Sequence, residues 1–248
     1  MNPNLTELVY IIDRSGSMHH LTGDTVGGYN AFLKEQKQLA GDAHLTTVLF
    51  DDKYELFCDH VDIKEACPMT ESNCYARGCT ALMDAIGRTI NAVGKRLAQT
   101  PEVERPSKVL FMIMTDGYEN SSKEFNRSAI KAMIEHQQSV YSWQFLFVGA
   151  GIDAYTEASS IGIQPQFVAS TYASPECVLD SLNAFSKAAT CTRSCASVEA
   201  LDASWKIDIK EPDSIAGKVV DVYSAVPLTN AVSYEDIALS VKSVSGDL

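Results

Sequence analysis

Continuous runs of apolar residues mark the strands that this sequence predicts. Residues 8–12 and 109–114 are unbroken apolar runs, as expected of central strands that are buried on both faces of a sheet. A third run is rich in β-branched residues and is followed by a turn signal and a short return strand, which is typical of a hairpin. The pattern predicts strands at 7–13, 45–50, 54–58, 109–114, 142–148 and 166–169.

Apolar residues at helical spacing predict helices between these strands. The clearest case is residues 81–97, where Leu82, Ile86, Ile90 and Val93 fall on one side. Strand and helix alternate, which favours an α/β fold with a doubly wound, mostly parallel central sheet, one antiparallel edge strand and helices on both faces. The predicted helices are 22–39, 81–97, 125–136, 153–161 and 175–189.

The pattern of apolar and polar residues changes after Cys195. Residues 205–210 alternate between apolar and polar like a two-sided strand, and two later segments, 219–226 and 237–244, fit either a strand or a helix. We therefore expect a domain at 1–195 and a C-terminal extension at 196–248, rich in β-structure and packed on that domain.

Composition and charge indicate a globular protein and argue against nucleic acid and membranes as its partners. With 248 residues and 46% apolar content, the chain is long enough for one well-packed core. Its formal charge of −12 makes nucleic acid and anionic membranes poor partners. No apolar run reaches the length of a membrane-spanning helix, and the first residues show no secretory signal, so we expect a cytoplasmic protein.

The seven cysteines are predicted to be free thiols, because the count is odd and the expected compartment is reducing. Four of them lie between Cys58 and Cys79, with His60 among them, which raises a zinc hypothesis. Their spacing contains no Cys-x-x-Cys pair, so structural zinc is disfavoured there.

Side chains that carry hard oxygen atoms follow two of the predicted strands. Asp13, Ser15 and Ser17 come where the first strand stops, and Asp116 follows the 109–114 run. Thr80 stands just before the clearest helix. Ligands of open parallel sheets bind outside the carboxyl ends of the strands, where these residues lie. Oxygens of this kind suit Mg²⁺, Mn²⁺ or Ca²⁺.

With these motifs, the chain resembles the von Willebrand factor A-type (vWA) domains over roughly residues 5–195. The metal-ion-dependent adhesion site (MIDAS) of that family takes Asp-x-Ser-x-Ser from a first strand, a Thr from a second loop and an Asp from a third. The resemblance implies a Rossmann-like fold in which hydroxyls touch the metal and the carboxylates bind it directly or through water. The implied ligands are Asp13, Ser15, Ser17, Thr80 and Asp116.

The ligand set suggests a function. Mg²⁺ prefers about six oxygen ligands in octahedral array, so five side chains leave at least one position to water. Hydroxyl groups cancel none of the ion's charge, and a partner's Asp or Glu carboxylate can replace that water. The leading hypothesis is a non-enzymatic, divalent-metal-dependent protein–protein interaction module from a bacterium or phage, with Mg²⁺ as cofactor and Mn²⁺ or Ca²⁺ as alternatives.

Three other interpretations use the same site. A metal-dependent phosphohydrolase would use Asp13 as phosphoryl acceptor and His19 or His20 as a base, but such enzymes usually place more carboxylates on the ion. The ion could instead only tie loops together. An acidic side chain from after residue 195 could also occupy the metal as an autoinhibitor. Asp84 and Glu119 are interpreted as a helix-dipole residue and a solvated loop residue.

Overall fold

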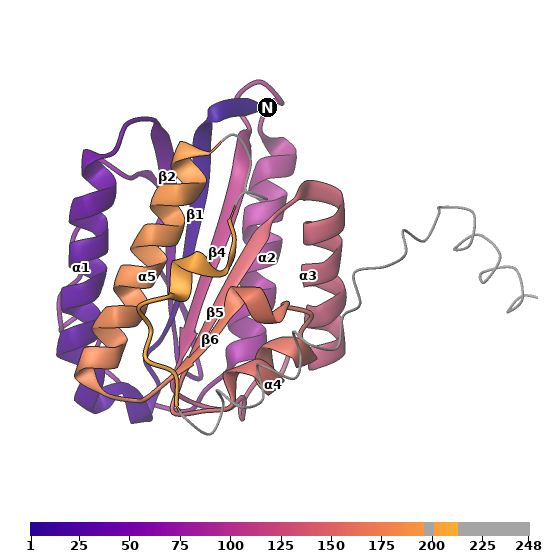
Figure 1. Ribbon diagram of the computed structural model, residues 1–248. Coiled ribbons are helices and arrows are strands. Elements are labelled where there is room, and N and C mark those ends of the chain that lie inside the picture. The colour runs from indigo at the N-terminus through magenta and orange to yellow at the C-terminus, as the bar shows by residue number, and fades with distance from the viewer. Residues whose placement is uncertain (196–200, 213–248) are drawn as a thin grey trace, which may run out of the picture. The chain divides into compact units, whose positions relative to one another are not determined.

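The computed structural model describes residues 1–195 and 201–212, and Figure 1 shows a sheet with helices on both faces. The six strands and five α-helices that these residues form are joined by short 3₁₀ helices and loops. In chain order the elements are β1 (Asn2–Asp13), η1 (Gly16–Leu21), α1 (Thr22–Gln38), β2 (Asp42–Phe50), β3 (Tyr54–Asp62), α2 (Leu82–Gln99), β4 (Pro106–Thr115), α3 (Arg127–Tyr141), β5 (Gln144–Ala150), α4 (Ala154–Ser160), η2 (Pro165–Phe167), β6 (Val168–Thr171), α5 (Pro175–Ser194) and η4 (Ala203–Lys206).

The sheet has the strand order β3-β2-β1-β4-β5-β6. β1 pairs in parallel with β2 and β4, β5 pairs in parallel with β4 and β6, and β3 runs antiparallel to β2 at the edge. This arrangement confirms the predicted fold class. Because β1 and β4 are parallel neighbours at the centre of the sheet, the residues that follow them emerge side by side at the same edge.

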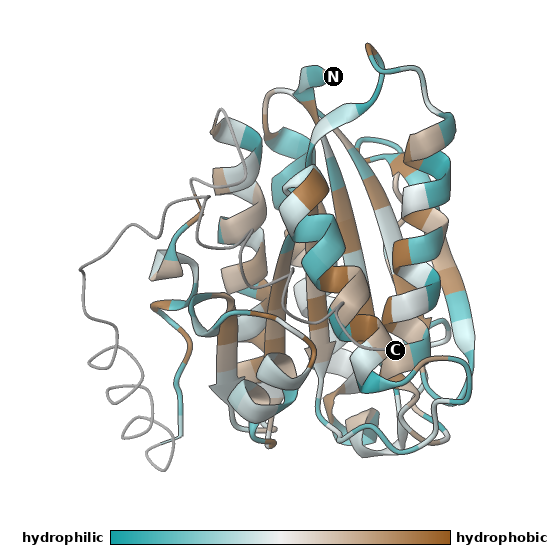
Figure 2. Cartoon of the chain, turned by 90° about the vertical axis from the view of Figure 1, so that its right-hand side faces the viewer, coloured by the Kyte–Doolittle hydropathy of each residue, from teal (hydrophilic) through white to brown (hydrophobic). Residues whose placement is uncertain are grey.

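From Leu5 to Asp13 every residue of β1 is buried, so both faces of the strand are covered there, as its apolar run predicts. Figure 2 shows hydrophobic residues along the strands of the sheet. Tyr10 points to the face covered by α1 and α5, where its ring meets Tyr29, Phe32 and Phe185 edge to face. Phe111 on β4 stacks on Trp143, which directly precedes β5, with ring centroids 5.4 Å apart, so Trp143 is a packing residue. The core therefore fixes β1 and β4 rigidly beneath the loops that carry the candidate site.

Several helix starts carry the capping residues that propensity favours. The Asn126 side chain accepts a hydrogen bond from the Ala129 N–H at the start of α3. Ser174 caps α5 in the same way, and Pro175 occupies the first turn, where its missing N–H has no cost. The helix boundaries differ from the predicted ones by up to five residues, most at the C-terminal ends of α3 and α5.

The sequence prediction of a strand at 205–210 is wrong. Trp205 lies in the 3₁₀ helix η4, where its ring stacks on Phe185 and its Nε1–H donates to the carbonyl of Gln166 at 3.1 Å. The apolar residues of the alternating pattern do not share one buried face: Trp205 and Ile209 are buried, whereas Ile207 between them is 79% exposed. The later segments at 219–226 and 237–244 lie outside the described residues.

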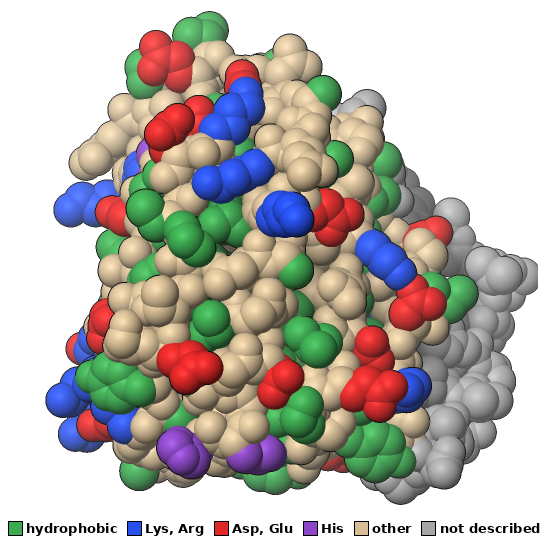
Figure 3. Space-filling model, turned by 90° about the vertical axis from the view of Figure 1, so that its left-hand side faces the viewer, with side chains coloured by type: hydrophobic (Ala, Val, Ile, Leu, Met, Phe, Trp, Pro, Cys, Tyr) green, Lys and Arg blue, Asp and Glu red, His purple; other side chains and the backbone are tan. Residues whose placement is uncertain are grey.

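Acidic, basic and hydrophobic side chains are interspersed on the face shown in Figure 3. The negative charge of the chain is therefore not gathered into a single acidic surface on that side. Within the part of the chain that the structure describes, no helix is both long enough and apolar enough to cross a membrane.

Candidate metal centre

Asp13 is the last residue of β1 and its carboxylate is fully buried. Its Oδ1 accepts a hydrogen bond from the Ser15 N–H at 2.7 Å, and its Oδ2 accepts one from the Thr115 hydroxyl at 2.6 Å. Burial raises the pKa of Asp13 to about 6; the hydrogen bonds oppose this and the nearby Asp116 charge adds to it. The donors of both hydrogen bonds are uncharged, so the Asp13 charge is held in place without being neutralised by them.

Hydroxyl groups link Asp13 to the second candidate carboxylate. The Oγ atoms of Ser15 and Ser17 lie 3.2 Å apart, and the Ser17 hydroxyl donates to Asp116 Oδ1 at 2.6 Å. Burial also raises the pKa of Asp116, while the hydrogen bond from Ser17 lowers it. Four of the five predicted ligands thus form one chain of contacts between the ends of β1 and β4.

Thr80, the fifth predicted ligand, is buried against the loop that follows β4. A Cβ atom added at Gly117 would lie 2.9 Å from the Thr80 Oγ1, so the glycine permits this close approach. The Thr80 N–H donates to Asn120 Oδ1, and the Asn120 N–H donates to the Thr80 carbonyl, both at 3.0 Å. The N-cap of α2 is Ala81, with no side-chain cap, so Thr80 does not serve as a capping residue.

Two acidic residues fasten the loop after β4 to the first turn of α2, a role that sequence reasoning missed. Asp84 accepts hydrogen bonds from the backbone N–H groups of residues 123–125. Burial would raise the pKa of Asp84, but these N–H groups outweigh it and hold the pKa below its usual value. Glu119 accepts from the N–H of Met83 at 2.9 Å and of Ser122 at 2.7 Å. Asp84 lies in the first turn of α2, as its helix-dipole interpretation expects, but it also holds the loop after β4. The interpretation of Glu119 as a solvated loop residue is wrong.

A buried arginine fixes the other side of the site. Arg14, directly after Asp13, donates through Nε to Asp51 Oδ2 at 3.1 Å and through Nη2 to Glu55 at 2.5 Å. Arg77 donates to the same Asp51 oxygen at 2.7 Å. Burial acts to raise the pKa of Asp51, but the two arginines and a backbone N–H hold it below its usual value. This network ties the end of β1 to the loop that precedes Thr80.

Gly78 allows the loop that precedes Thr80 to turn close to Asp52. Its φ of +68° lies in the left-handed region, and an added Cβ would fall 2.1 Å from Asp52 Oδ1. The Gly78 carbonyl also accepts a hydrogen bond from the Gly16 N–H at 3.2 Å. The turn that carries Ser15 and Ser17 is thus joined directly to the loop that carries Thr80.

All seven cysteines are free thiols. Among the described residues, no cysteine belongs to a group of three or more side chains that could hold a metal ion. The sequence grouped His60 with the cysteines at 58–79, but in the fold its ring lies with Glu7 and His44. Cys191 and Cys195, which the sequence places one helical turn apart, have their Sγ atoms 3.6 Å apart.

The oxygen cluster fits a hard divalent cation by its chemistry. It offers two carboxylates and three hydroxyls and no sulfur or nitrogen ligand, which is the donor set that Mg²⁺ and Mn²⁺ accept and Zn²⁺ shares less readily. Both carboxylates have raised pKa values, mainly because burial removes water without supplying a compensating charge. A bound cation would supply that charge.

The sheet order, the antiparallel edge strand and the position of this cluster define a vWA-type fold. Solved structures with the same fold include the manganese-loaded TRAP protein of Plasmodium vivax (16% identity, TM-score 0.52, covering 69% of this chain and 70% of that one). Another is the proximal thread matrix protein 1 of the mussel byssus with a zinc-occupied MIDAS motif (16% identity, TM-score 0.51, covering 75% of this chain and 46% of that one). A third is a von Willebrand factor type A structure from Catenulispora acidiphila (16% identity, TM-score 0.51, covering 75% of this chain and 42% of that one).

At such identities the likeness shows the fold alone. The chain spans less than half the length of the mussel and Catenulispora structures. No family model matches the sequence, and no curated protein matches it either.

Proposed function

We propose that this chain is a divalent-metal-dependent protein-interaction module that binds an acidic side chain of a partner through the metal. The observation that carries the proposal is the chain of contacts from the buried carboxylate of Asp13 through two serines to the partly buried carboxylate of Asp116, at the ends of neighbouring strands. One structural neighbour is manganese-loaded and another has a zinc-occupied MIDAS motif, which supports a divalent metal in this proposal.

In this proposal Asp13, Ser15, Ser17, Thr80 and Asp116 hold Mg²⁺ or Mn²⁺. The ion supplies a positive charge that attracts a carboxylate. The protein's own residues do the positioning: Thr115 orients the Asp13 carboxylate, and Asn120 fixes the backbone of Thr80 on both sides. Three of the five ligands are uncharged, so the site keeps an affinity for an Asp or Glu of a partner.

The alternative of a phosphohydrolase named His19 or His20 as its base. His20 interacts electrostatically with Asp116 and opposes the rise that burial causes in the pKa of that carboxyl. Its Nδ1 lies 3.0 Å from the Ser17 carbonyl and its Nε2 lies 3.4 Å from the Ala173 carbonyl. Both ring nitrogens face backbone acceptors, so this geometry favours the interaction module over the enzyme.

Calorimetric titration with Mg²⁺ and Mn²⁺ tests the ligand set. We expect one bound ion in the wild type, and no measurable binding in Asp116→Ala. The Ser17→Ala variant, which removes one uncharged oxygen from an exposed side chain, should bind more weakly. Asp42→Asn is the matched control, because Asp42 is an exposed carboxylate at the other end of β2. Equal binding by Asp116→Ala and the wild type would overturn the ligand assignment.

Affinity capture tests the partner. Wild type and Asp116→Ala, each immobilised in Mg²⁺ or in EDTA, should differ by proteins that the wild type retains only with Mg²⁺. Substituting the acidic residues of a captured protein by their amides should then abolish its retention. Retention that is unchanged by EDTA or by the Asp116 substitution contradicts a metal-bridged interaction.

A further inference from the structure

A second group of metal-ligating side chains lies six residues before Asp13 along β1, roughly 20 Å from the oxygen cluster. It consists of Glu7 on β1, His44 on β2 and His60 on β3. One ligand atom from each residue lies within 4.8 Å of the other two, and the imidazole rings have centroids 4.0 Å apart. Among the described residues, no other group of three His, Cys, Asp or Glu side chains converges in this way.

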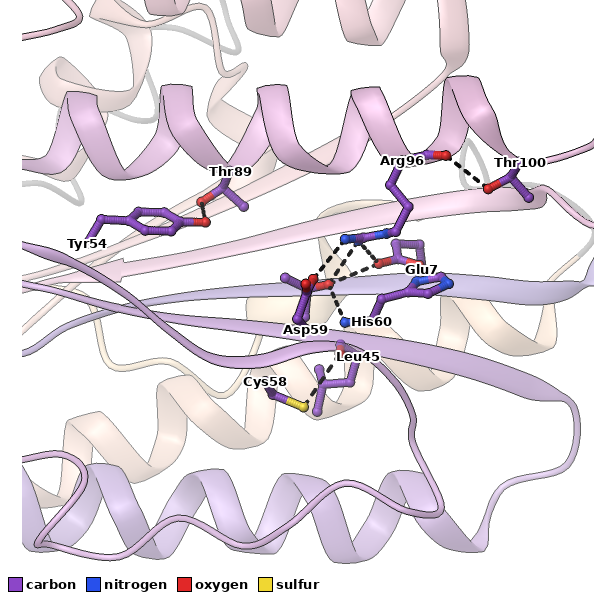
Figure 4. Close-up of polar contacts among 10 residues, drawn as sticks. Glu7, Leu45, Tyr54, Cys58, Asp59, His60, Thr89, Arg96 and Thr100 are labelled. Carbon is purple, nitrogen blue, oxygen red and sulfur yellow. Dashed lines mark hydrogen bonds and ion pairs between the residues drawn. The ribbon is translucent and has the colours of Figure 1, made fainter.

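Strand register brings Glu7 and His44 together. The two residues are partners in the parallel pairing of β1 with β2, and side chains at the same register of neighbouring strands point to the same face. That face is the one from which Arg96 of α2 reaches the sheet (Figure 4).

A bulge in the edge strand adds His60. Leu45 pairs with Val61 and Thr47 pairs with Cys58, so two residues of β3, one of them His60, stand opposite Thr46 alone. The backbone of His60 has a φ of +51°, in the left-handed region, and its N–H donates to the Thr46 hydroxyl at 3.2 Å. Bulges of this kind redirect side chains and concentrate near functional sites, as does left-handed backbone at residues other than glycine.

The carboxylate of Glu7 is fully buried, and its two oxygens have separate roles. Oε1 accepts hydrogen bonds from Arg96 Nη2 at 2.7 Å and from the Thr46 hydroxyl at 3.1 Å, which fixes the orientation of the group. Oε2 faces His60 Nδ1 at 2.9 Å. Arg96 also pairs with Asp59 at 2.9 Å (Figure 4), so its charge is shared and Glu7 is not its only counter-ion.

His44 contributes a nitrogen that is otherwise unused. Its Nδ1 is buried and has no hydrogen-bond partner among the described residues. An imidazole nitrogen that carries no proton offers a lone pair to a metal ion. A metal ion would provide the partner that this nitrogen lacks.

We propose that Glu7, His44 and His60 form a second metal site, selective for a transition metal such as Zn²⁺ and distinct from the oxygen cluster. Two imidazoles and one carboxylate are the ligands of open zinc sites, in which water takes the fourth position. The His60 side chain is 31% exposed, so water and the ion can reach the group from solvent. Ligand atoms of tetrahedral zinc lie roughly 3.3 Å apart, which small side-chain movements can supply.

Zinc titration of the full chain in an Asp116→Ala background tests this site separately from the oxygen cluster. The background protein should bind one Zn²⁺ and unfold at a higher temperature with Zn²⁺ present. Adding His44→Gln or His60→Asn should weaken binding by more than the roughly 10–100-fold that changes around a metal ligand usually cost. Asn is chosen at position 60 because it tolerates left-handed backbone.

His136→Gln is the matched control, because His136 is an exposed histidine on α3 and should leave zinc affinity unchanged. Absence of zinc binding in the Asp116→Ala protein, or equal binding with and without the histidine substitutions, would overturn the site. In the wild-type protein, His44→Gln or His60→Asn should lower the number of Zn²⁺ ions bound per chain by one, whether or not the oxygen cluster also binds an ion. Loss of the proposed Mg²⁺ function would leave this result intact.

Discussion

Replacing Asp13 by Asn should stabilise the metal-free protein while destroying its metal binding. The structure accommodates the amide: its oxygen can accept from the Ser15 N–H, as Oδ1 does now. Its NH₂ group can donate to the Thr115 hydroxyl, which can then donate to the Gly117 carbonyl at 3.0 Å. The substitution therefore removes a buried charge and keeps the hydrogen bonds around it.

The magnitude follows from the pKa of Asp13, which burial raises from 3.8 to about 6. The folded protein holds this proton more tightly than the unfolded chain does. The carboxyl therefore makes the protein less stable as the pH rises from about 4 to about 6, and the loss is complete above the folded pKa. The difference between the folded and unfolded pKa of Asp13 lowers the free energy of unfolding by about 3 kcal/mol at pH 7.5, and by about half of that at pH 5.

Urea unfolding in EDTA at pH 5 and pH 7.5 measures this effect. We expect Asp13→Asn to exceed the wild type by up to about 3 kcal/mol at pH 7.5 and by less at pH 5. With Mg²⁺ at 100 times its dissociation constant the wild type should gain about 2.7 kcal/mol and the variant nothing. Asp42→Asn, an exposed control, should follow the wild type throughout. If the Asp13 variant is the less stable protein in EDTA at pH 7.5, the raised pKa is refuted.

Three further substitutions test the supports of the site. Gly78→Ala should lower the free energy of unfolding by at least about 1–2 kcal/mol in urea, because alanine is strained at a φ of +68° and its Cβ would overlap Asp52. Asp84→Ala leaves three backbone N–H groups without acceptors, so limited proteolysis should cut the loop after β4 faster than in the wild type, and equal rates would contradict the fastening role. Trp205→Ala removes a buried ring stacked on Phe185 and should cost about 3–5 kcal/mol by thermal or urea unfolding; a cost below 1 kcal/mol would show that η4 is not part of the core.

Much of the fold was predictable because its signals are local. The apolar runs of β1 and β4 are long and uninterrupted, and hydrophobic spacing identified α2 without ambiguity. The end of β1 could be located from the sequence because Asp13 follows the run directly. Neighbouring parallel strands then bring Asp116 to it, which is a consequence of topology rather than of sequence spacing.

The supports of the site were not predictable, because their partners are distant in sequence. Arg14 joins Asp51, and Asp84 accepts from N–H groups about forty residues away. Neither pairing leaves a periodic pattern in the chain. The failure at Trp205 has another cause: Trp205, Ile207 and Ile209 alternate with polar residues in the sequence, but Ile207 is exposed in the fold, so the pattern does not mark one buried face of a strand. The positive φ of His60 was not predictable either, because it depends on a bulge that is defined only by the pairing of β2 with β3.

The bulge at His60 has a second physical consequence. β3 is an edge strand, and a flat edge offers a row of unpaired N–H and C=O groups on which another chain can add a strand. Two register shifts in the pairing of β2 with β3 interrupt that row and increase its local twist. The same irregularity that orients a histidine thus protects the protein from edge-to-edge aggregation, and straightening it would make the chain prone to self-association.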